Sequence, residues 1–420
     1  MMKNQKISAS HVFVPGGFPK ITYVAREEYG LENRVCMAKD NLTKLMVITG
    51  PTKSGKTVLV DKIFPQESAI WIDGGMITDE NSFWELIVDK LDLFTSFERT
   101  ESDSNSSGIE SNLSLDGNVL VAKGGVRVSG KSDTSLTSGY LNGRSVSAKT
   151  VAISALRTSL IPLVVDDFHY IEKPTQKSIV RALKAPIMHG LPAIFIAIPN
   201  RKYDAIEVER EMTGRIENIE MPIWEEDELA EIAVTGFKVL NVQVKKSLID
   251  KLTHAAYGSP FLMQEFCKAL CVNSEIQESS KEIQYISENI DVTDIFAEIA
   301  EHSGRSMFEK LKRGPRARTD RISRRLIDGT TTDIYGVVMN ALKSLQPGVE
   351  SMPYDTLRAN IKNIMIDQPP QKHEVSRVLD KIAQISYTDT SSTKVIDWQK
   401  DNDIITITDP FFAFFLKWAR

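Results

Sequence analysis

The 420-residue chain contains few cysteines and no long hydrophobic run, and each absence argues against a class of protein. Its three cysteines are Cys36, Cys267 and Cys271, and no Cys/His pair lies near them to complete a zinc site, which favours buried thiols in a reducing compartment. No apolar stretch approaches the ~20 residues that a membrane-spanning helix needs. The first six residues lack the apolar core of a signal peptide. We therefore expect a cytoplasmic protein without a membrane partner.

The chain also lacks a strong excess of charge of one sign. Its net charge of −5 provides no overall attraction to nucleic acid, so any such binding must use a local patch. The hydrophobic content of 42% and the charged content of 25% fall in the range of ordinary globular proteins. With ~150 residues per domain, the length predicts two or three domains.

One motif carries most of the chemistry. It comprises Gly50, Pro51, Thr52, Lys53, Ser54, Gly55, Lys56 and Thr57, and it fits the phosphate-binding pattern G-x-x-x-x-G-K-[ST] without mismatch. The apolar residues 45–48 before it and the apolar run that opens with Val58 after it are typical of a strand–loop–helix unit. The complete pattern in this context argues against a glycine-rich turn that binds nothing.

Each part of this motif has a physical task. The glycines let backbone N–H groups surround an anion, and the N-terminus of the following helix adds partial positive charge. Lys56 would reach the β- and γ-phosphates, and the Thr57 hydroxyl would hold Mg²⁺. The motif therefore predicts a site for ATP and Mg²⁺.

A second motif follows the apolar run 160–165, which ends in Asp166 and Asp167. A continuous apolar run is typical of a buried parallel strand, and carboxylates at its end lie at the edge of the sheet where ligands bind. We assign Asp166 to an outer-sphere contact with Mg²⁺ and Asp167 to polarising the attacking water. An alternative is that one of the two aspartates only caps the next segment.

Alternating strands and helices predict an α/β fold over residues 21–222, a P-loop core with a parallel sheet and helices on both faces. We expect residues 1–20 to form a loose N-terminal arm and residues 21–24 a short β-like run. A helix is expected to follow, passing through Val35 to about Leu45. Another helix is expected over 83–97. The Ser/Gly-rich residues 100–148 are an insertion, for which exposed strands or a mobile hairpin and a disordered loop remain equal alternatives.

The second half of the chain is mostly helical in pattern. Residues 223–290, with helices near 227–240, 247–256 and 260–272, predict a helical lid, and 291–333 a basic helical linker. Residues 334–420 show the order of a winged helix, with helices at 334–345, 354–360 and 372–385 before strands at 395–398 and 404–407. The aromatic run 411–418 is expected to pack into a core.

A basic stretch lies just before this last unit. It contains Lys310, Lys312, Arg313, Arg316, Arg318, Arg321, Arg324 and Arg325, with Asp320 as its single acid. Such a cluster would bind the nucleic-acid backbone in a salt-sensitive, sequence-independent way. The alternatives are a solvated linker face and a surface that docks on the acidic core.

Taken together, these motifs resemble STAND-type ATPases and their archaeal-ATPase and replication-initiator relatives in the AAA+ group. The resemblance covers roughly residues 21–272 and the winged-helix order. Residues 24–27 resemble the family's V-G-R-E element, with Ala25 in place of glycine, which implies that Arg26 lies near the nucleotide. Residues 164–169 look like the D-D-x-H form of the second motif.

The resemblance also suggests three further site residues. Arg201 would sense the γ-phosphate, although Pro199 and Asn200 stand where the family has Thr-Thr. Pro260, in a G-x-P element, would touch the adenine from the lid, and Arg215 would act in trans on a neighbouring subunit. As alternatives, Arg26 and Arg201 are surface residues, His169 only packs, and Arg215 forms a surface ion pair of little energetic value.

This resemblance implies a slow ATPase that changes conformation or oligomerises when it binds ATP. Such a protein would regulate a separate effector, in defence, transposition or signalling. One alternative is a replication- or transposition-type ATPase that acts on DNA through the basic stretch and the winged helix. Another is a scaffold that binds ATP without hydrolysing it.

Overall fold

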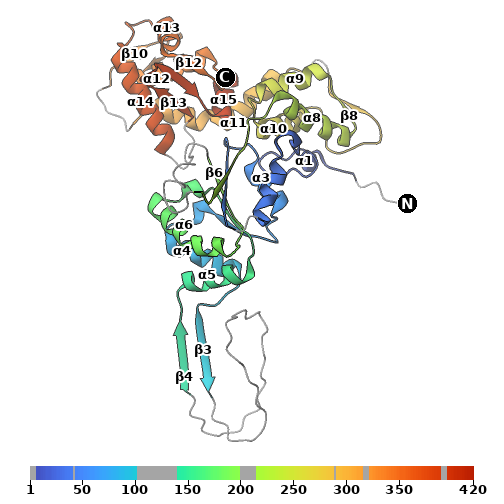
Figure 1. Cartoon of the computed structure of the whole chain (residues 1–420). Helices are drawn as coiled ribbons and strands as arrows, with labels where there is room; N and C mark the ends of the chain where they lie inside the picture. The colour runs from blue at the N-terminus through green and yellow to red at the C-terminus, as the bar shows by residue number, and fades with distance from the viewer. Residues whose placement is uncertain are drawn as a thin grey trace, which may run out of the picture.

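The computed structural model describes residues 6–40, 43–101, 140–198, 214–287, 290–315, 321–388 and 395–420. The chain forms a sheet-based core, a helical lid above it and a C-terminal unit beside the lid, and a two-stranded ribbon extends from the opposite end of the core (Figure 1). No helix in these ranges is both long enough and apolar enough to cross a membrane.

A five-stranded parallel sheet forms the centre of the core, in the order β2–β5–β6–β1–β7. The strands are β1 (Leu45–Thr49), β2 (Ile70–Asp73), β5 (Leu163–Asp166), β6 (Ala193–Ala197) and β7 (Ile216–Glu220). Every residue of β1 and β6 is buried, as expected for strands covered on both faces. The predicted α/β fold with a parallel sheet is confirmed.

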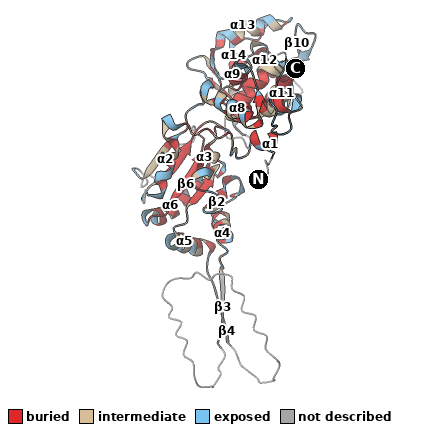
Figure 2. Cartoon of the chain, turned by 90° about the vertical axis from the view of Figure 1, so that its right-hand side faces the viewer, coloured by how far each residue is buried: buried red, intermediate tan, exposed pale blue. Residues whose placement is uncertain are grey.

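Helices cover both faces of this sheet. On one face lie α4 (Glu80–Lys90), α5 (Ala148–Ser159) and α6 (Lys173–Met188), and on the other lie α2 (Leu31–Cys36) and α3 (Lys56–Ile63). Successive side chains of β1 alternate between the two hydrophobic clusters, with Val47 in the first and Ile48 in the second. Figure 2 shows the buried strands between the layers.

Several local predictions were wrong. Residues 21–24 form no strand, and the helix expected to reach Leu45 ends at Cys36, followed by a single 3₁₀ turn. The helix expected over 83–97 covers Glu80–Lys90, because Asp79 and Ser82 form a capping box at its start and Asp92 adopts φ 52° just beyond its end.

The insertion begins with an antiparallel ribbon. Strand β3 (Ser96–Glu101) pairs with β4 (Tyr140–Ser145), and the ribbon leaves the core beside α5 (Figure 1). The expected exposed strands or hairpin therefore start four residues before position 100. The rest of the insertion, 102–139, lies outside the described residues.

The lid contains α8 (Glu226–Leu240), α9 (Lys246–Ala255) and α10 (Pro260–Asn273), close to the predicted helices. The described part of the expected loose arm, residues 6–20, packs on it through α1 (Ala9–Val12) and Phe13. Phe13 is fully buried and meets Phe237 edge to face at 5.1 Å between ring centroids. Gly236 admits the Phe13 ring, since a Cβ there would lie 2.3 Å from Phe13 Cε1.

Two helices join the lid to the C-terminal unit. In the described part of the expected helical linker, residues 291–333, the helix is α11 (Val292–Arg313), and it packs along α15 (Pro410–Trp418). Phe411 and Phe414 of α15 belong to the hydrophobic cluster of the lid, whereas Phe412 and Phe415 belong to that of the C-terminal unit. The prediction that the aromatic run packs into a core is confirmed.

The C-terminal unit combines three helices with a small antiparallel sheet. Its order is α12 (Ile334–Leu345), β12 (Ser351–Pro353), α13 (Tyr354–Ile364), α14 (Lys372–Thr388), β13 (Ile396–Gln399) and β14 (Ile404–Ile407). The strands align as β12–β14–β13. Short two-residue strands, β8 (Val242–Gln243) with β9 (Gln284–Tyr285) and β10 (Arg324–Arg325) with β11 (Thr331–Thr332), complete the described structure. The winged-helix assignment stays a prediction.

Gly304 allows α11 and α15 to approach closely, which leads to a testable prediction. A Cβ added at Gly304 would lie 2.2 Å from Phe415 Cβ, so Gly304→Ala must push the helices apart. We expect the variant to lose ~1–3 kcal/mol of unfolding free energy in urea, despite the better helix propensity of alanine. Ser306→Ala, at an exposed position of the same helix, is the control and should be nearly neutral. Unchanged stability of Gly304→Ala would contradict this packing.

Candidate functional site

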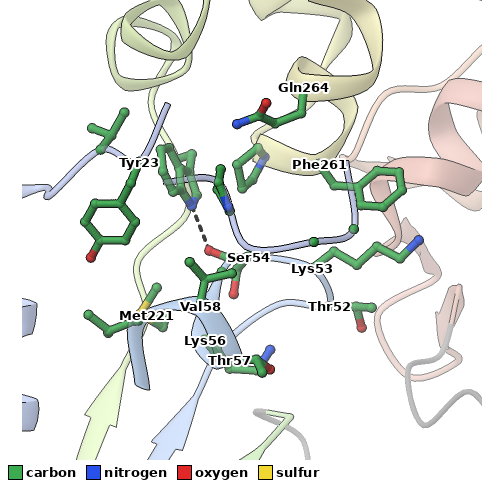
Figure 3. Close-up of a pocket in the computed structure, with 18 of the residues that line it drawn as sticks. Tyr23, Thr52, Lys53, Ser54, Lys56, Thr57, Val58, Met221, Phe261 and Gln264 are labelled. Carbon is green, nitrogen blue, oxygen red and sulfur yellow. Dashed lines mark hydrogen bonds between the residues drawn. The ribbon is translucent and has the colours of Figure 1, made fainter. Parts of the chain in front are cut away.

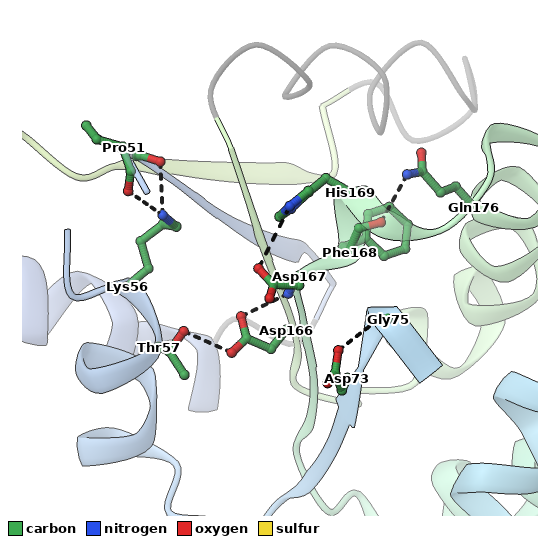
Figure 4. A network of polar contacts seen from close by, with 11 residues as sticks. Pro51, Lys56, Thr57, Asp73, Gly75, Asp166, Asp167, Phe168, His169 and Gln176 are labelled. Atoms are coloured by element: carbon green, nitrogen blue, oxygen red, sulfur yellow. Dashed lines mark hydrogen bonds and ion pairs between the residues drawn. The ribbon is translucent and has the colours of Figure 1, made fainter. Parts of the chain in front are cut away.

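The predicted phosphate loop and the predicted aspartates meet at the carboxyl edge of the sheet. The Thr57 hydroxyl donates a 2.9 Å hydrogen bond to Asp166 Oδ2, and the Asp167 N–H donates one of the same length to Asp166 Oδ1 (Figure 4). Strand β6 lies between β1 and β5, so the contact spans two steps of the sheet. Asp166 therefore faces the phosphate loop, and neither aspartate makes the side-chain hydrogen bond that would cap the 3₁₀ turn at 168–170.

The backbone of the phosphate loop is shaped to bind an anion. Lys53 (φ 56°) and Gly55 (φ 96°) are both left-handed and flank Ser54. Alternation of this kind turns successive N–H groups toward a common point. Helix α3 begins directly after, at Lys56, and its N-terminus adds positive potential.

Lys56 places a buried cation inside this loop. Its ammonium donates to the carbonyl oxygens of Gly50 at 3.0 Å and Pro51 at 2.7 Å. Burial lowers the pKa of Lys56 to about 8, while the nearby charges of Asp167 and Asp166 oppose the shift. A lysine that is partly desolvated and adjacent to carboxylates interacts strongly with an incoming anion.

Asp167 has the properties of a proton acceptor. Burial, together with the charges of Asp166 and Asp73, raises its pKa to about 6, against the effect of Lys56. Its side chain remains 48% exposed, so water can reach it. A carboxyl group with a pKa near neutrality, in an accessible position, is suited to general acid–base chemistry.

His169 and Gln176 support the turn that carries Asp167. His169 is buried, and its Nε2 lies 3.9 Å from Asp167 Oδ1 (Figure 4). Gln176, on α6, donates to the carbonyl oxygens of Phe168 at 3.0 Å and Ile171 at 2.9 Å. No sequence motif pointed to Gln176, because its role depends on a helix that packs back on the turn.

A cavity of about 410 Å³ lies between the phosphate loop, residues 14–31 and the lid (Figure 3). This volume is typical of a small-molecule site. The residues predicted from the sequence that line it are Arg26, Thr52, Lys53, Ser54, Gly55, Lys56, Thr57, Val58, Asp167 and Pro260. Further, largely apolar lining comes from the N-terminal segment (Tyr23), from residues 221–225 that lead into the lid and are called the hinge below (Met221 and Trp224), and from the lid (Gln264).

Arg26 forms part of the cavity wall, but its hydrogen bonds hold the hinge of the lid. Its Nε donates to Glu228 Oε1 at 2.6 Å, and its two Nη atoms donate to the carbonyl oxygens of Pro222 and Ile223 at 3.0 and 2.9 Å. The guanidinium lies 4.7 Å from the ring centroid of Trp224. No sequence motif marks Glu228, because it is one of several acidic residues in the first turn of α8.

Trp224 connects this hinge to the phosphate loop. Its indole Nε1 donates a 2.9 Å hydrogen bond to the Ser54 carbonyl (Figure 3). This bond ties residues 221–225, which lead into the helical lid, to the backbone of the phosphate loop. No pattern in the sequence marked Trp224, since a single tryptophan before a helix usually serves packing.

Two predicted arginines do not join the site in the described part of the chain. Arg201 and its neighbours lie outside the described residues. Arg215 lies at the opposite edge of the sheet, where its carbonyl oxygen accepts from the Leu45 N–H at 2.9 Å. The length of β1 separates it from the phosphate loop, so a role for Arg215 in trans stays a prediction.

The oxygen donors fit Mg²⁺. Among the described residues no cluster of three or more His, Cys, Asp or Glu could hold a metal ion by itself. However, Mg²⁺ commonly takes one or two protein oxygens and completes its shell with phosphates and water. The adjacent Thr57 hydroxyl and Asp166 carboxylate provide such a pair.

The basic stretch is partly neutralised within the molecule. Three of its four arginines in the described ranges pair with acids around the C-terminal unit, Arg321 with Asp333 at 2.5 Å, Arg324 with Glu374 at 3.3 Å and Arg325 with Asp367 at 2.8 Å. Arg316 and Arg318 lie outside the described residues. These pairs favour a structural role for the C-terminal half of the stretch.

The cysteines agree in part with the prediction of core thiols. Cys267 and Cys271 are buried on α10, and burial raises the pKa of the Cys271 thiol to about 12, so it stays protonated. Cys36 is exposed at the end of α2.

Comparison with solved structures identifies the fold. The Walker-type ATPase of Pyrococcus abyssi is 13% identical in sequence and superposes with a TM-score of 0.54, over 97% of this chain and 99% of that one. The chain has the fold of an archaeal-type P-loop ATPase. Such low identity assigns the ATPase fold and leaves the activity to be argued from the site.

Other solved structures match less closely. Cdc6p from Pyrobaculum aerophilum has a TM-score of 0.43 at 11% identity and covers 99% of this chain and 98% of its own. The STAND protein with a tetratricopeptide repeat sensor from Pyrococcus horikoshii has a TM-score of 0.36 at 13% identity, over 96% of this chain and 43% of that one. No protein-family model and no curated protein matches the sequence.

The hinge pair of Arg26 and Glu228 leads to a stability prediction. The two side chains are only 2% and 12% exposed, so Arg26→Met would leave Glu228 with a nearly buried, unpaired charge. We expect this variant to lose ~3–5 kcal/mol of unfolding free energy in urea. The matched control is Lys44→Met, which breaks the more exposed pair with Glu217 and should cost ~1 kcal/mol or less. Equal effects of the two variants would show that the hinge pair is not structural.

Proposed function

We propose that this chain binds ATP with Mg²⁺ at the edge of its sheet, hydrolyses it slowly, and uses the nucleotide state to control a partner. The observation that carries the proposal is the contact between Thr57 and Asp166, which places the end of the phosphate loop against the carboxylate strand beside the cavity. The full sequence motif, the loop conformation and the ATPase fold support the same assignment.

Each site residue is assigned a separate role in binding or hydrolysis. Lys56 and the N–H groups of the loop hold the phosphates, and Thr57 and Asp166 hold Mg²⁺, which supplies charge neutralisation when bound. Asp167 orients a water molecule and accepts its proton, with its carboxylate kept in place by the turn that Gln176 supports. Arg201 is proposed to stabilise charge on the γ-phosphate.

The lid is proposed to respond to the nucleotide. Pro260 and Trp224 line the cavity from the lid side, and Trp224 also binds the Ser54 carbonyl. A nucleotide in the cavity would therefore contact the lid on one side of the hinge at residues 221–225 and the phosphate loop on the other. A switch of this kind would control a separate effector or the assembly of several copies, in which Arg215 of one copy would act on the site of another.

Two substitutions test the division between binding and hydrolysis. Lys56→Ala removes the buried cation, so we expect affinity for Mg–ATP to fall about tenfold or more. Asp167→Asn keeps the shape but cannot accept a proton, so binding should persist while turnover falls by about 10²–10⁴-fold. Binding is measured by calorimetry and turnover by phosphate release.

Lys90→Ala, at an exposed position of α4, serves as the control and should change neither quantity. If Lys56→Ala binds Mg–ATP as tightly as the parent chain, the assignment of the site is wrong. If Asp167→Asn turns over at the parent rate, Asp167 is not the proton acceptor.

A second candidate function is nucleic-acid binding by the C-terminal unit, if it acts as a winged helix. The observation in its favour is a row of exposed residues on α14, comprising His373, Arg377, Lys381 and Gln384. Their spacing of three or four residues puts them on one face of the helix. Such a basic face would contact phosphates and base edges in a groove.

This candidate is tested with the double variant Arg377→Ala/Lys381→Ala. We expect it to weaken duplex DNA binding and to lower the slope of log affinity against log salt by about two, one for each lost cation. Lys362→Ala, exposed on the neighbouring helix α13, should leave both unchanged. DNA binding that is equally strong in the double variant would remove α14 from the interface.

A further inference from the structure

Lys53, a residue of the phosphate loop, contacts the lid and helix α15, which joins the lid to the C-terminal unit. Its ammonium nitrogen lies 4.0 Å from the ring centroid of Phe261 and 4.1 Å from that of Phe411. Phe261 belongs to α10 of the lid and Phe411 to α15, and their rings meet edge to face at 5.2 Å between centroids. In Figure 3 the Lys53 side chain runs toward Phe261 and away from Lys56 and Thr57.

These contacts lie at the wall between two cavities. Thr52, Lys53 and Phe261 line the candidate nucleotide cavity and also a second cavity of about 610 Å³ between the lid and the C-terminal unit. Phe411 lines only the second one. An effect of Phe411 on nucleotide binding would therefore have to pass through Lys53 or Phe261.

The backbone of Lys53 is strained where the phosphate site needs it. Its φ of 56° is a left-handed conformation, which costs free energy in any residue with a Cβ. The same conformation is repeated at Gly55, and backbone alternation of this kind is what directs loop N–H groups toward an anion. A lysine at this position holds the shape only if other contacts compensate for the strain.

The two aromatic contacts can compensate for the free-energy cost of the left-handed backbone at Lys53. A cation over an aromatic face at a partly buried site stabilises by an amount comparable to the cost of one left-handed residue. Burial lowers the pKa of Lys53, whereas the nearby charges of Asp409 and Glu265 raise it, so the surrounding carboxylates help to keep the ammonium charged.

We propose that the contact of Lys53 with Phe261 and Phe411 holds the phosphate loop in its anion-binding conformation, so that nucleotide affinity depends on the position of the C-terminal unit. The inference rests on the proposed function of the site. Lys53 is a positioning residue, since its side chain acts on the backbone of the loop and not on the phosphates.

The consequence is a regulatory link through α15. Phe411 faces Lys53, while Phe412 and Phe415 of the same helix are buried in the C-terminal unit. A partner that displaces this unit would withdraw the Phe411 ring and weaken nucleotide binding. By linkage, bound nucleotide would oppose the partner to the same extent.

The test is a set of variants of the full chain, with Mg–ADP affinity measured by calorimetry. Lys53→Met removes the charge and keeps the strain, and Phe411→Leu removes the ring and keeps an apolar side chain. We expect each to weaken binding about three- to tenfold, and the double variant to be no weaker than the worse single one. Lys53→Gly removes the strain, so in that background Phe411→Leu should have no effect.

Phe414→Leu is the matched control, because Phe414 lies on the same helix but packs against Phe266 and Phe296. It should leave affinity unchanged, and thermal unfolding of each variant checks that the chain is folded. Additive losses, or an equal loss from Phe411→Leu in the Lys53→Gly background, would overturn the proposal. A parent chain that does not bind Mg–ADP would instead overturn the proposed function itself.

Discussion

The candidate site depends on the parallel arrangement of β1 and β5, whose carboxyl ends meet at one edge of the sheet. Because both strands end there, the helix that follows β1 and the aspartates that follow β5 come within hydrogen-bonding distance, as Thr57 and Asp166 show. An antiparallel or shifted arrangement would put these groups on different edges. Burial of the apolar faces of the central strands stabilises the core, and it also holds the strands in the arrangement that brings the site residues together.

Around this edge the molecule joins its parts through a few buried contacts. Arg26 fixes the hinge of the lid through Glu228 and two carbonyl groups, and Trp224 ties the same hinge to the phosphate loop. Lys53 extends the connection to α15, whose aromatic residues belong to two hydrophobic clusters at once. The candidate site is therefore in direct contact with the lid and with the helix that leads to the C-terminal unit.

The strongly periodic or motif-bearing segments could be predicted from sequence. The sequence pattern predicts strand β14 and helix α12 at their observed limits, and it identifies the phosphate loop and the aspartate pair with the strands that precede them. Local errors arose where non-local packing overrode local pattern. Phe13 looked like part of a loose arm because the groove beside Gly236 that receives it lies more than two hundred residues away.

The sequence by itself determined the chemistry of the site, because a glycine-rich phosphate loop and a carboxylate strand are local patterns with local physical causes. Only the tertiary structure decided which side chains hold that site in place. Glu228, Trp224, Gln176 and Phe411 act through contacts between segments distant in sequence, and no periodicity reports such contacts. It also showed that Arg324 and Arg325 pair with acids of their own chain, since pairing depends on distance in space.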